Sequence, residues 1–163
     1  MARKRKSARS LLFPFTCLLL ALAASVVLAA PRDMGGWGKD GAYNRLYHAS
    51  ELDKLKGTIL RITEVVPMKG MSPGVAIIIK DRDGERVMVH VGPKWFLGDS
   101  IGLSRGDRVK VKGAWAEIDG KDVFMASKIK KGDYFELKVR LTKDGTPFWT
   151  MSPEQLARER ASR

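Results

Sequence analysis

The sequence predicts an all-β protein that forms one small barrel of five or six strands. Beyond residue 55, short runs of β-branched and aromatic residues are separated by turn residues, which is the pattern of consecutive strands. Asp-Gly pairs at 83–84, 119–120 and 144–145 lie between or after these runs, and the tolerance of Asp-Gly for positive φ suits tight hairpins. About 100 residues of this kind are enough for one barrel and too few for two domains.

Residues 1–29 have the composition of an export signal, in which a basic head precedes an uncharged apolar run. We place the cleavage after Ala29, because cleavage after Ala30 would put Pro31 next to the scissile bond. Cys17 lies inside the apolar run without the pattern of a lipoprotein signal. The alternative is an uncleaved anchor in the inner membrane, since about 18–20 apolar residues can cross a bilayer. Both interpretations predict a domain outside the cytoplasm, periplasmic or secreted.

The net charge and the cysteine content of the chain exclude some classes of function and favour others. The chain carries 30 basic and 18 acidic residues, a net charge of +12, and five of the basic residues lie in the export signal. The mature chain therefore keeps 25 basic residues, and its net charge is +7. It has no cysteine, which excludes disulfides, thiolate metal sites and a cysteine nucleophile. We expect such a basic exported domain to meet an acidic partner, an anionic polymer or lipid headgroups.

The mature chain divides into three parts. Residues 30–53 are rich in glycine and polar residues without a sustained period, which predicts a flexible leader. The barrel domain follows over residues 54–150, and its predicted strands are 56–66, 74–81, 86–91, 107–118, 122–129 and 134–142. Residues 151–163 start with Ser152, Pro153 and Gln155, a capping-box pattern that predicts a short charged C-terminal helix.

The longest connection, residues 92–106, joins the third and fourth strands and begins with a Gly-Pro pair. Proline ends the third strand because it donates no hydrogen bond to the sheet. In an OB-like (oligonucleotide- and oligosaccharide-binding) barrel, the segment between these two strands closes one end of the barrel. We therefore predict an OB-like fold in which Trp95, Phe96 and Leu97 form a structural barrel plug. A β-sandwich of the same strands is the alternative.

Four segments resemble small exported OB-like proteins of bacteria: "GTILRITEVV", "PMKGMSPG", "VHVGPKWFL" and "LSRGDRVKVKGAW". The resemblance is to the domain shared by the magnetosome-associated MamS and MamX proteins, over residues 54–150. It implies an exported accessory or binding module linked to metal or redox systems. The cytochrome-like member of that pair attaches haem through a C-x-x-C-H motif, which this chain lacks, so covalent haem is not implied. A shared domain does not by itself imply magnetosome function.

Catalytic groups are sparse, and we expect a protein that is not an enzyme and needs no cofactor. The mature chain has two histidines, His48 in the leader and His90 on the third strand. Its carboxylates lie mostly in hairpin turns. The sequence therefore offers no pairing of a nucleophile with a base.

The candidate binding surface combines the third strand with the loop before the second strand. Met88 and His90 alternate with valines and so share one face of the third strand, and we expect loop 67–74 to lie beside it. The candidate binding residues lie on this face, in the loop and at the exit of the strand: Met68, Lys69, Met71, Met88, His90 and Lys94. The favoured ligand is a protein partner in the cell envelope.

Two alternatives remain open. Met68 and Met71, at M-x-x-M spacing, are with His90 weak candidates for a copper site, although methionine also fills irregular cores. The second alternative is an anionic ligand, a glycan, lipid headgroup or nucleic acid, on the basic and aromatic side chains that OB surfaces use. Those side chains are Lys94, Trp95, Phe96, Lys110, Lys112 and Trp115. Export argues against nucleic acid as the ligand. Lysines that alternate with valines are ordinarily the solvent-exposed residues of a strand, and the same explanation applies to the lysines at 128–131.

Overall fold

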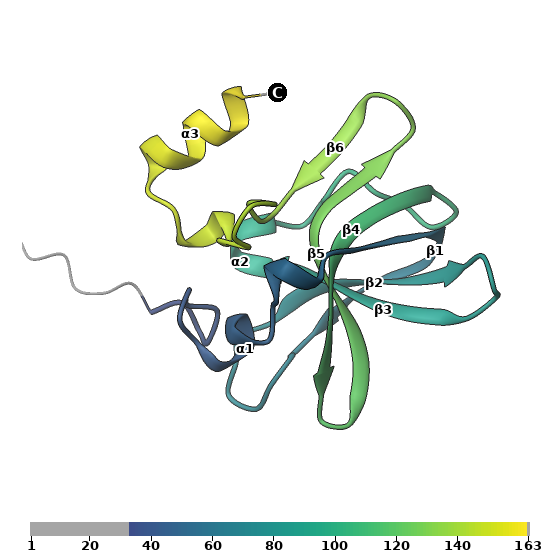
Figure 1. The fold of residues 1–163 in the computed structure, drawn as a ribbon, viewed down its shortest axis with the longest axis horizontal. Coiled ribbons are helices and arrows are strands. Elements are labelled where there is room, and N and C mark those ends of the chain that lie inside the picture. Colours follow the sequence, from purple (N-terminus) through teal and green to yellow (C-terminus); the bar gives the residue numbers. More distant parts are fainter. Residues whose placement is uncertain (1–32, 163) are drawn as a thin grey trace, which may run out of the picture. The chain divides into compact units, whose positions relative to one another are not determined.

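The structure is a computed structural model and describes residues 33–162, drawn in Figure 1. The predicted export signal, residues 1–29, lies outside the described residues. The strands are β1 (Asp53–Val65), β2 (Gly74–Asp81), β3 (Arg86–Pro93), β4 (Arg108–Ile118), β5 (Lys121–Lys131) and β6 (Phe135–Lys138). The helical elements are short: α1 (Ala42–Arg45), η1 (Ala49–Glu51), α2 (Lys94–Leu97), η2 (Phe148–Thr150) and α3 (Pro153–Ala161). The all-β prediction with a short C-terminal helix is confirmed.

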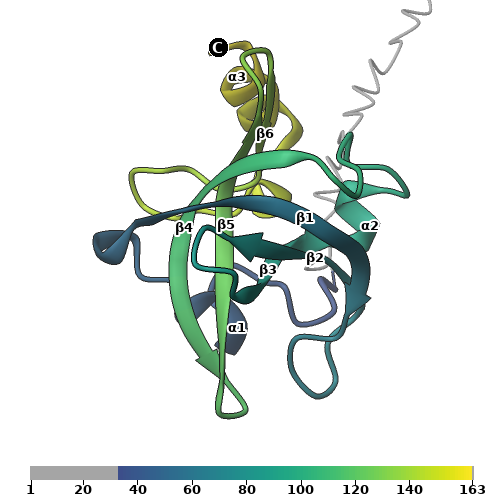
Figure 2. The ribbon, with the colours of Figure 1, turned by 90° about the vertical axis from the view of Figure 1, so that its right-hand side faces the viewer.

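All six strands belong to one sheet, in the order β3-β2-β1-β4-β5-β6, with neighbours antiparallel. β3 also pairs in parallel with β5, through Val89 with Phe124 and His90 with Met125, so the sheet curls back on itself. Figure 2 shows β4 and β1 arching over β2 and β3. The closing contact is only two residue pairs long, which gives the partly open barrel of an OB-like fold rather than a sandwich. β6 lies at the free edge of the sheet.

Two glycines lie where the long strands β1 and β4 pass close to the backbones of neighbouring strands in this barrel. Gly57 of β1 pairs with both β2 and β4, and a Cβ at this position would lie 2.3 Å from the carbonyl oxygen of Lys80. Gly113 of β4 follows a register shift, and a Cβ there would lie 2.1 Å from the carbonyl oxygen of Met125. The strands approach too closely at both points for any side chain.

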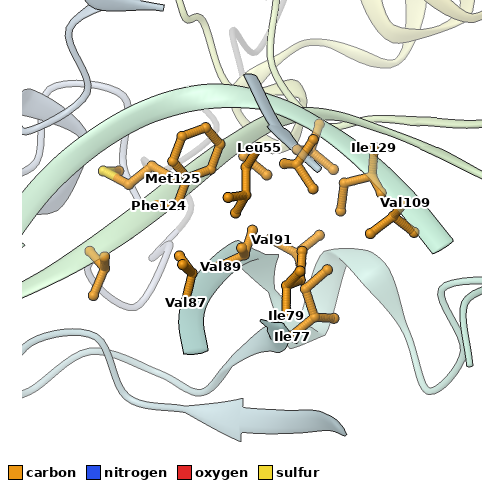
Figure 3. Packing of buried hydrophobic residues seen from close by; sticks show 14 of the residues in the cluster. Leu55, Ile77, Ile79, Val87, Val89, Val91, Val109, Phe124, Met125 and Ile129 are labelled. Carbon is orange, nitrogen blue, oxygen red and sulfur yellow. The ribbon is translucent and has the colours of Figure 1, made fainter. Parts of the chain in front are cut away.

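The core fills the space inside the curled sheet. Figure 3 shows Leu55, Val109 and Ile129 facing Ile77 and Ile79 across this space. These residues come from β1, β4, β5 and β2 in turn, and all belong to the buried hydrophobic cluster. Burying a side chain of this size contributes about 1.5–3 kcal/mol, so the core holds the strands together without disulfides.

Residues 33–52 pack against the barrel, in contrast to the flexible leader that their composition suggested. Trp37 is fully buried, and a Cβ on Gly74 would lie 2.5 Å from its ring. The indole Nε1 of Trp37 donates to the carbonyl of Ser72 at 3.0 Å, and the Trp37 carbonyl accepts from the indole of Trp149 at 2.9 Å. One large aromatic ring anchors a segment that is otherwise glycine-rich, because its burial removes a large apolar area from water.

The C-terminal helix α3 begins as the sequence predicted. The backbone N–H of Gln155 donates to Oγ of Ser152 at 3.2 Å, and Oε1 of Gln155 accepts from the backbone N–H of Ser152 at 3.0 Å. This is a capping box with Pro153 at the first helical position. None of the α3 residues is buried, so the helix lies on the surface. Within residues 33–162, every helix is too short or too polar to span a membrane.

Candidate functional site

Two rows of lysines cross the outside of four neighbouring strands. In the first row each residue pairs with the next, from β1 to β6: Lys54, Lys112, Lys128 and Lys138. The second row runs in the same way from β1 to β5: Lys56, Lys110 and Lys130. We name these seven residues the lysine face.

The alternation of the strands turns the lysine face away from the core. The residue between each pair of lysines is buried: Leu55 in β1, Val111 in β4 and Ile129 in β5. Successive side chains of a strand point to opposite faces, so the lysines on either side point outward. Opposite residues on neighbouring strands have Cβ atoms about 4.5–5.5 Å apart, and like charges placed there repel each other. A bound anion would relieve this repulsion.

Glu136 of β6 offsets part of this charge. Its Oε2 lies 2.9 Å from Nζ of Lys130 and 3.6 Å from Nζ of Lys128, and its Oε1 lies 3.6 Å from Nζ of Lys138. Partial burial alone would raise the pKa of Glu136, but the hydrogen bond from Lys130 and the nearby lysine charges outweigh burial and lower it. The remaining four lysines form no ion pair with any residue from 33 to 162: Lys54, Lys56, Lys110 and Lys112.

Trp115 of β4 lies at the rim of the barrel, on the face of the sheet opposite the lysines, next to Asp53, the residue before Lys54. Its indole Nε1 donates to the carboxylate of Asp53 at 3.1 Å, and its ring packs edge-to-face on buried Phe124 with centroids 5.0 Å apart. The residue nevertheless remains 41% exposed. An aromatic side chain held in place at the surface is typical of an anchor in a protein interface.

His90 is buried, whereas the sequence placed it on an exposed binding surface. Only 3% of the residue is exposed, and its Nδ1 lies 3.2 Å from the hydroxyl of Tyr43. Tyr43 belongs to the N-terminal segment, which covers this part of β3, while Met88 two residues earlier is half-buried. Burial lowers the pKa of His90 to about 4, so the ring is neutral at pH 7. A partner or a metal ion would have to displace Tyr43 to reach it.

Beside Tyr43, the structure holds a buried guanidinium that the sequence did not single out. Arg140 is 3% exposed, and its Cζ lies 4.8 Å from the ring centroids of both Tyr47 and Trp149. Its Nη2 donates to Oδ1 of Asn44 at 2.7 Å, and none of the carboxylates in residues 33–162 forms an ion pair with it. Aromatic faces and an amide thus surround the charge, which ties the N-terminal segment to the C-terminal one.

The other predicted binding residues have separate surroundings. Met68 and Met71 are partly buried and pack against the core, while Lys69 between them is exposed. Lys94 forms an ion pair with Glu64 of β1. Among residues 33–162, no group of three or more His, Cys, Asp or Glu side chains is arranged so that it could hold a metal ion. The contact of the two methionines with the core is the ordinary packing role of this residue.

The predicted barrel plug is present in part. Phe96 and Leu97 of α2 pack against the core, and the Phe96 ring lies 6.1 Å from the ring of Trp149, centroid to centroid. Trp95 does not belong to the plug, because the single turn of α2 leaves it 44% exposed. Trp149, which is 4% exposed, fills the space instead.

Comparison with protein families gives a match over residues 51–136 to the model of the MamS/MamX magnetosome protein family. The matched region is more than half of the chain and runs from the last residue of η1 into β6. The chain belongs to the MamS/MamX family. A search of curated proteins found no match.

Six of the seven residues of the lysine face lie inside the region that matches the MamS/MamX family, and Lys138 lies two positions beyond it. Sequence reasoning missed this face because Lys110 with Lys112 and the lysines at 128–131 were each interpreted alone, as one solvated strand, and Lys54 and Lys56 were not singled out. A signal was present in the chain: lysines two apart occur at 54–56, 110–112 and 128–130. Only the strand order brings the three pairs together.

Proposed function

We propose that this member of the MamS/MamX family is an exported, non-catalytic binding module whose lysine face docks on an acidic partner protein in the cell envelope. The observation that carries the proposal is the pair of lysine rows that cross the neighbouring strands. Among residues 33–162, only one carboxylate, that of Glu136, forms ion pairs with these lysines. The location outside the cytoplasm is inferred from the export-signal composition of residues 1–29.

The chemistry of the lysine face supports binding rather than catalysis. Its side chains end in ammonium groups, and their positive charge steers an acidic surface toward the sheet. A covalent mechanism would need a nucleophile beside a general base, and His90 of the barrel is a weak base, because burial lowers its pKa to about 4, and is covered by Tyr43. These features support a surface that holds a partner.

Trp115, which is exposed at the rim of the barrel close to Lys54, favours a protein over a simple polyanion as the partner, because a protein surface can extend past the lysine face to reach it. Its ring is exposed, yet it is fixed by the hydrogen bond to Asp53 and by contact with Phe124. A rigid aromatic side chain adds apolar contact area at low cost in conformational entropy, which protein interfaces use. A polymer held by charge alone gains little from such an anchor.

The test uses immobilised poly-L-glutamate as an acidic polypeptide probe. Lys54→Glu combined with Lys112→Glu reverses the charge at two directly opposed positions and should weaken retention about tenfold or more at low salt. The matched control is Lys121→Glu combined with Lys143→Glu, which makes the same charge change at exposed lysines away from the face. Its loss of affinity should be clearly smaller.

Trp115→Ala separates the two kinds of partner. We expect it to weaken retention on poly-L-glutamate without changing the salt dependence, because it removes apolar contact and no charge. Dextran sulfate, a polyanion without a peptide backbone, is the comparison probe. If dextran sulfate binds as tightly and Trp115→Ala binds normally, the face is a general polyanion surface and docking on a protein is wrong.

A further inference from the structure

A groove of about 530 Å³ opens at one end of the lysine face. Its lining comes from Lys56–Thr58 of β1 and Arg108–Lys110 of β4, flanked by the turn after β2 and the turn after β5. β1 and β4 lie between β2 and β5 in the sheet, so they form the floor and the two turns form the sides. In Figure 1 the turn after β2 projects to the right and the turn after β5 to the upper right.

The groove carries a strong excess of positive charge. It is lined by six basic side chains and two carboxylates, namely Lys56, Lys80, Arg82, Arg108, Lys110 and Lys130 with Asp81 and Asp133. Asp81 already serves the turn, since its Oδ1 accepts the backbone N–H groups of Asp83 at 2.9 Å and Glu85 at 2.8 Å. Only Lys130 of the six basic residues has an ion pair among the described residues, with Glu136. The remaining five are free to hold an anion.

Thr58 gives the groove its depth. It pairs with Lys80 on one side and with Arg108 on the other, and the side chains of all three point out of the barrel. Adjacent strands lie about 4.8 Å apart, so the backbones of Lys80 and Arg108 are about 10 Å apart. A small side chain between two long cationic ones leaves room for a ligand, with a hydroxyl group at the bottom as a hydrogen-bond donor.

We propose that this groove binds a short oligophosphate chain. Arg82 and Arg108 carry planar guanidinium forks that match the oxygens of phosphate groups, and the lysines add mobile point charges. No aromatic ring lines the groove, and its one apolar side chain is buried Val109, so neither a nucleobase nor an acyl chain finds a contact. The volume lies within the range of about 300–1,000 Å³ for small-ligand sites, which is more than one phosphate needs. The proposal does not rest on docking to an acidic protein.

Calorimetric titration with inorganic tripolyphosphate tests the site. At about 0.15 M salt we expect one equivalent to bind. The groove variant combines Lys80→Gln, Arg82→Gln and Arg108→Gln, and it should bind tripolyphosphate at least about tenfold more weakly. The matched control combines Lys54→Gln, Lys112→Gln and Lys138→Gln, which removes three charges from the same sheet outside the groove and should cost less than about threefold. Thermal unfolding reports whether both variants fold, and Arg82→Gln alone, in an exposed turn, serves if the triple variant does not.

Three results would overturn the proposal. Equal losses in the groove and control variants would mean that net charge, and no defined site, governs binding. Citrate binding as tightly as tripolyphosphate would mean that any multivalent anion suffices. Lipid headgroups offer the same phosphate chemistry, so vesicles of phosphatidylglycerol are the last probe, and binding to vesicles without binding to tripolyphosphate would place the site on a membrane surface. Weak retention of the Lys54→Glu and Lys112→Glu variant on poly-L-glutamate bears only on the protein-docking proposal.

Discussion

The hydroxyl of Tyr43 lies 3.2 Å from Nδ1 of His90, and the two rings stack with their centroids 6.0 Å apart. Tyr43 belongs to the N-terminal segment, and His90 stands on β3 where that strand pairs with β5 and closes the barrel. The contact therefore covers the outer side of the β3–β5 pairing that closes the barrel. Its strength depends on whether the His90 ring is neutral.

We expect the protein to lose stability as the pH falls from about 6.5 to about 4. Burial lowers the pKa of His90 to about 4, whereas a histidine in the unfolded chain has a pKa of about 6.5. Between these values the unfolded chain binds a proton that the folded chain does not. The free energy of unfolding should therefore fall by about 1.4 kcal/mol per pH unit, and urea unfolding at about pH 7, 6 and 5 measures this.

His90→Gln is the matched control for this titration. It keeps a polar side chain toward Tyr43 and removes the group that titrates, so its unfolding midpoint should vary much less over the same interval. The carboxylates whose pKa is lowered in the fold lose their contribution at lower pH, as they become protonated; they are Asp107, Glu136, Asp144 and Glu154. A natural chain as insensitive to pH as the variant would contradict a buried neutral His90.

Alanine at Phe96 and at Trp95 should have very different effects on stability. Phe96 packs against the core and against Trp149, and we expect Phe96→Ala to lower the free energy of unfolding by about 3 kcal/mol. Trp95 is 44% exposed, so Trp95→Ala should cost no more than about 1 kcal/mol. Urea unfolding of the two variants gives both numbers. The reverse order would restore Trp95 as the barrel plug.

The strands could be predicted because their signals are local. Alternation of apolar and polar residues and the Asp-Gly turns act within a few positions, and each predicted run overlaps an observed strand. The last run was predicted too long: β6 ends at Lys138, and the chain then bends so that Arg140 pairs with Pro147. The bend depends on the burial of Arg140 against aromatic rings from distant segments, which no local pattern shows.

The candidate sites could not be predicted in the same way, because they depend on contacts between distant segments. The lysine face exists only in the register that places Lys54 opposite Lys112 and Lys112 opposite Lys128. His90 had the right alternation for an outward position, but the N-terminal segment folds over it through Trp37 and Tyr43. Glycine-rich composition concealed that packing, since two large rings outweigh the flexibility of the residues around them.

Processing of the N-terminus is testable by mass spectrometry. The basic head, the apolar run and the small residues before Pro31 predict cleavage after Ala29. Protein recovered from the periplasm or the medium should therefore begin with Ala30. Recovery of the chain from Met1 in a membrane fraction would instead support an anchored domain.

Glu136→Gln should strengthen binding of poly-L-glutamate to the lysine face. Its carboxylate pairs with Lys128, Lys130 and Lys138, so its removal frees three ammonium groups and raises the net charge of the face by one. Retention should rise most at low salt and fall more steeply as salt screens the charges. Partly exposed ion pairs contribute little to stability, so the free energy of unfolding should change by no more than about 1 kcal/mol. Glu117→Gln adds the same charge at an exposed position of β4 outside the lysine face, and an equal gain in that variant would show that net charge alone governs binding.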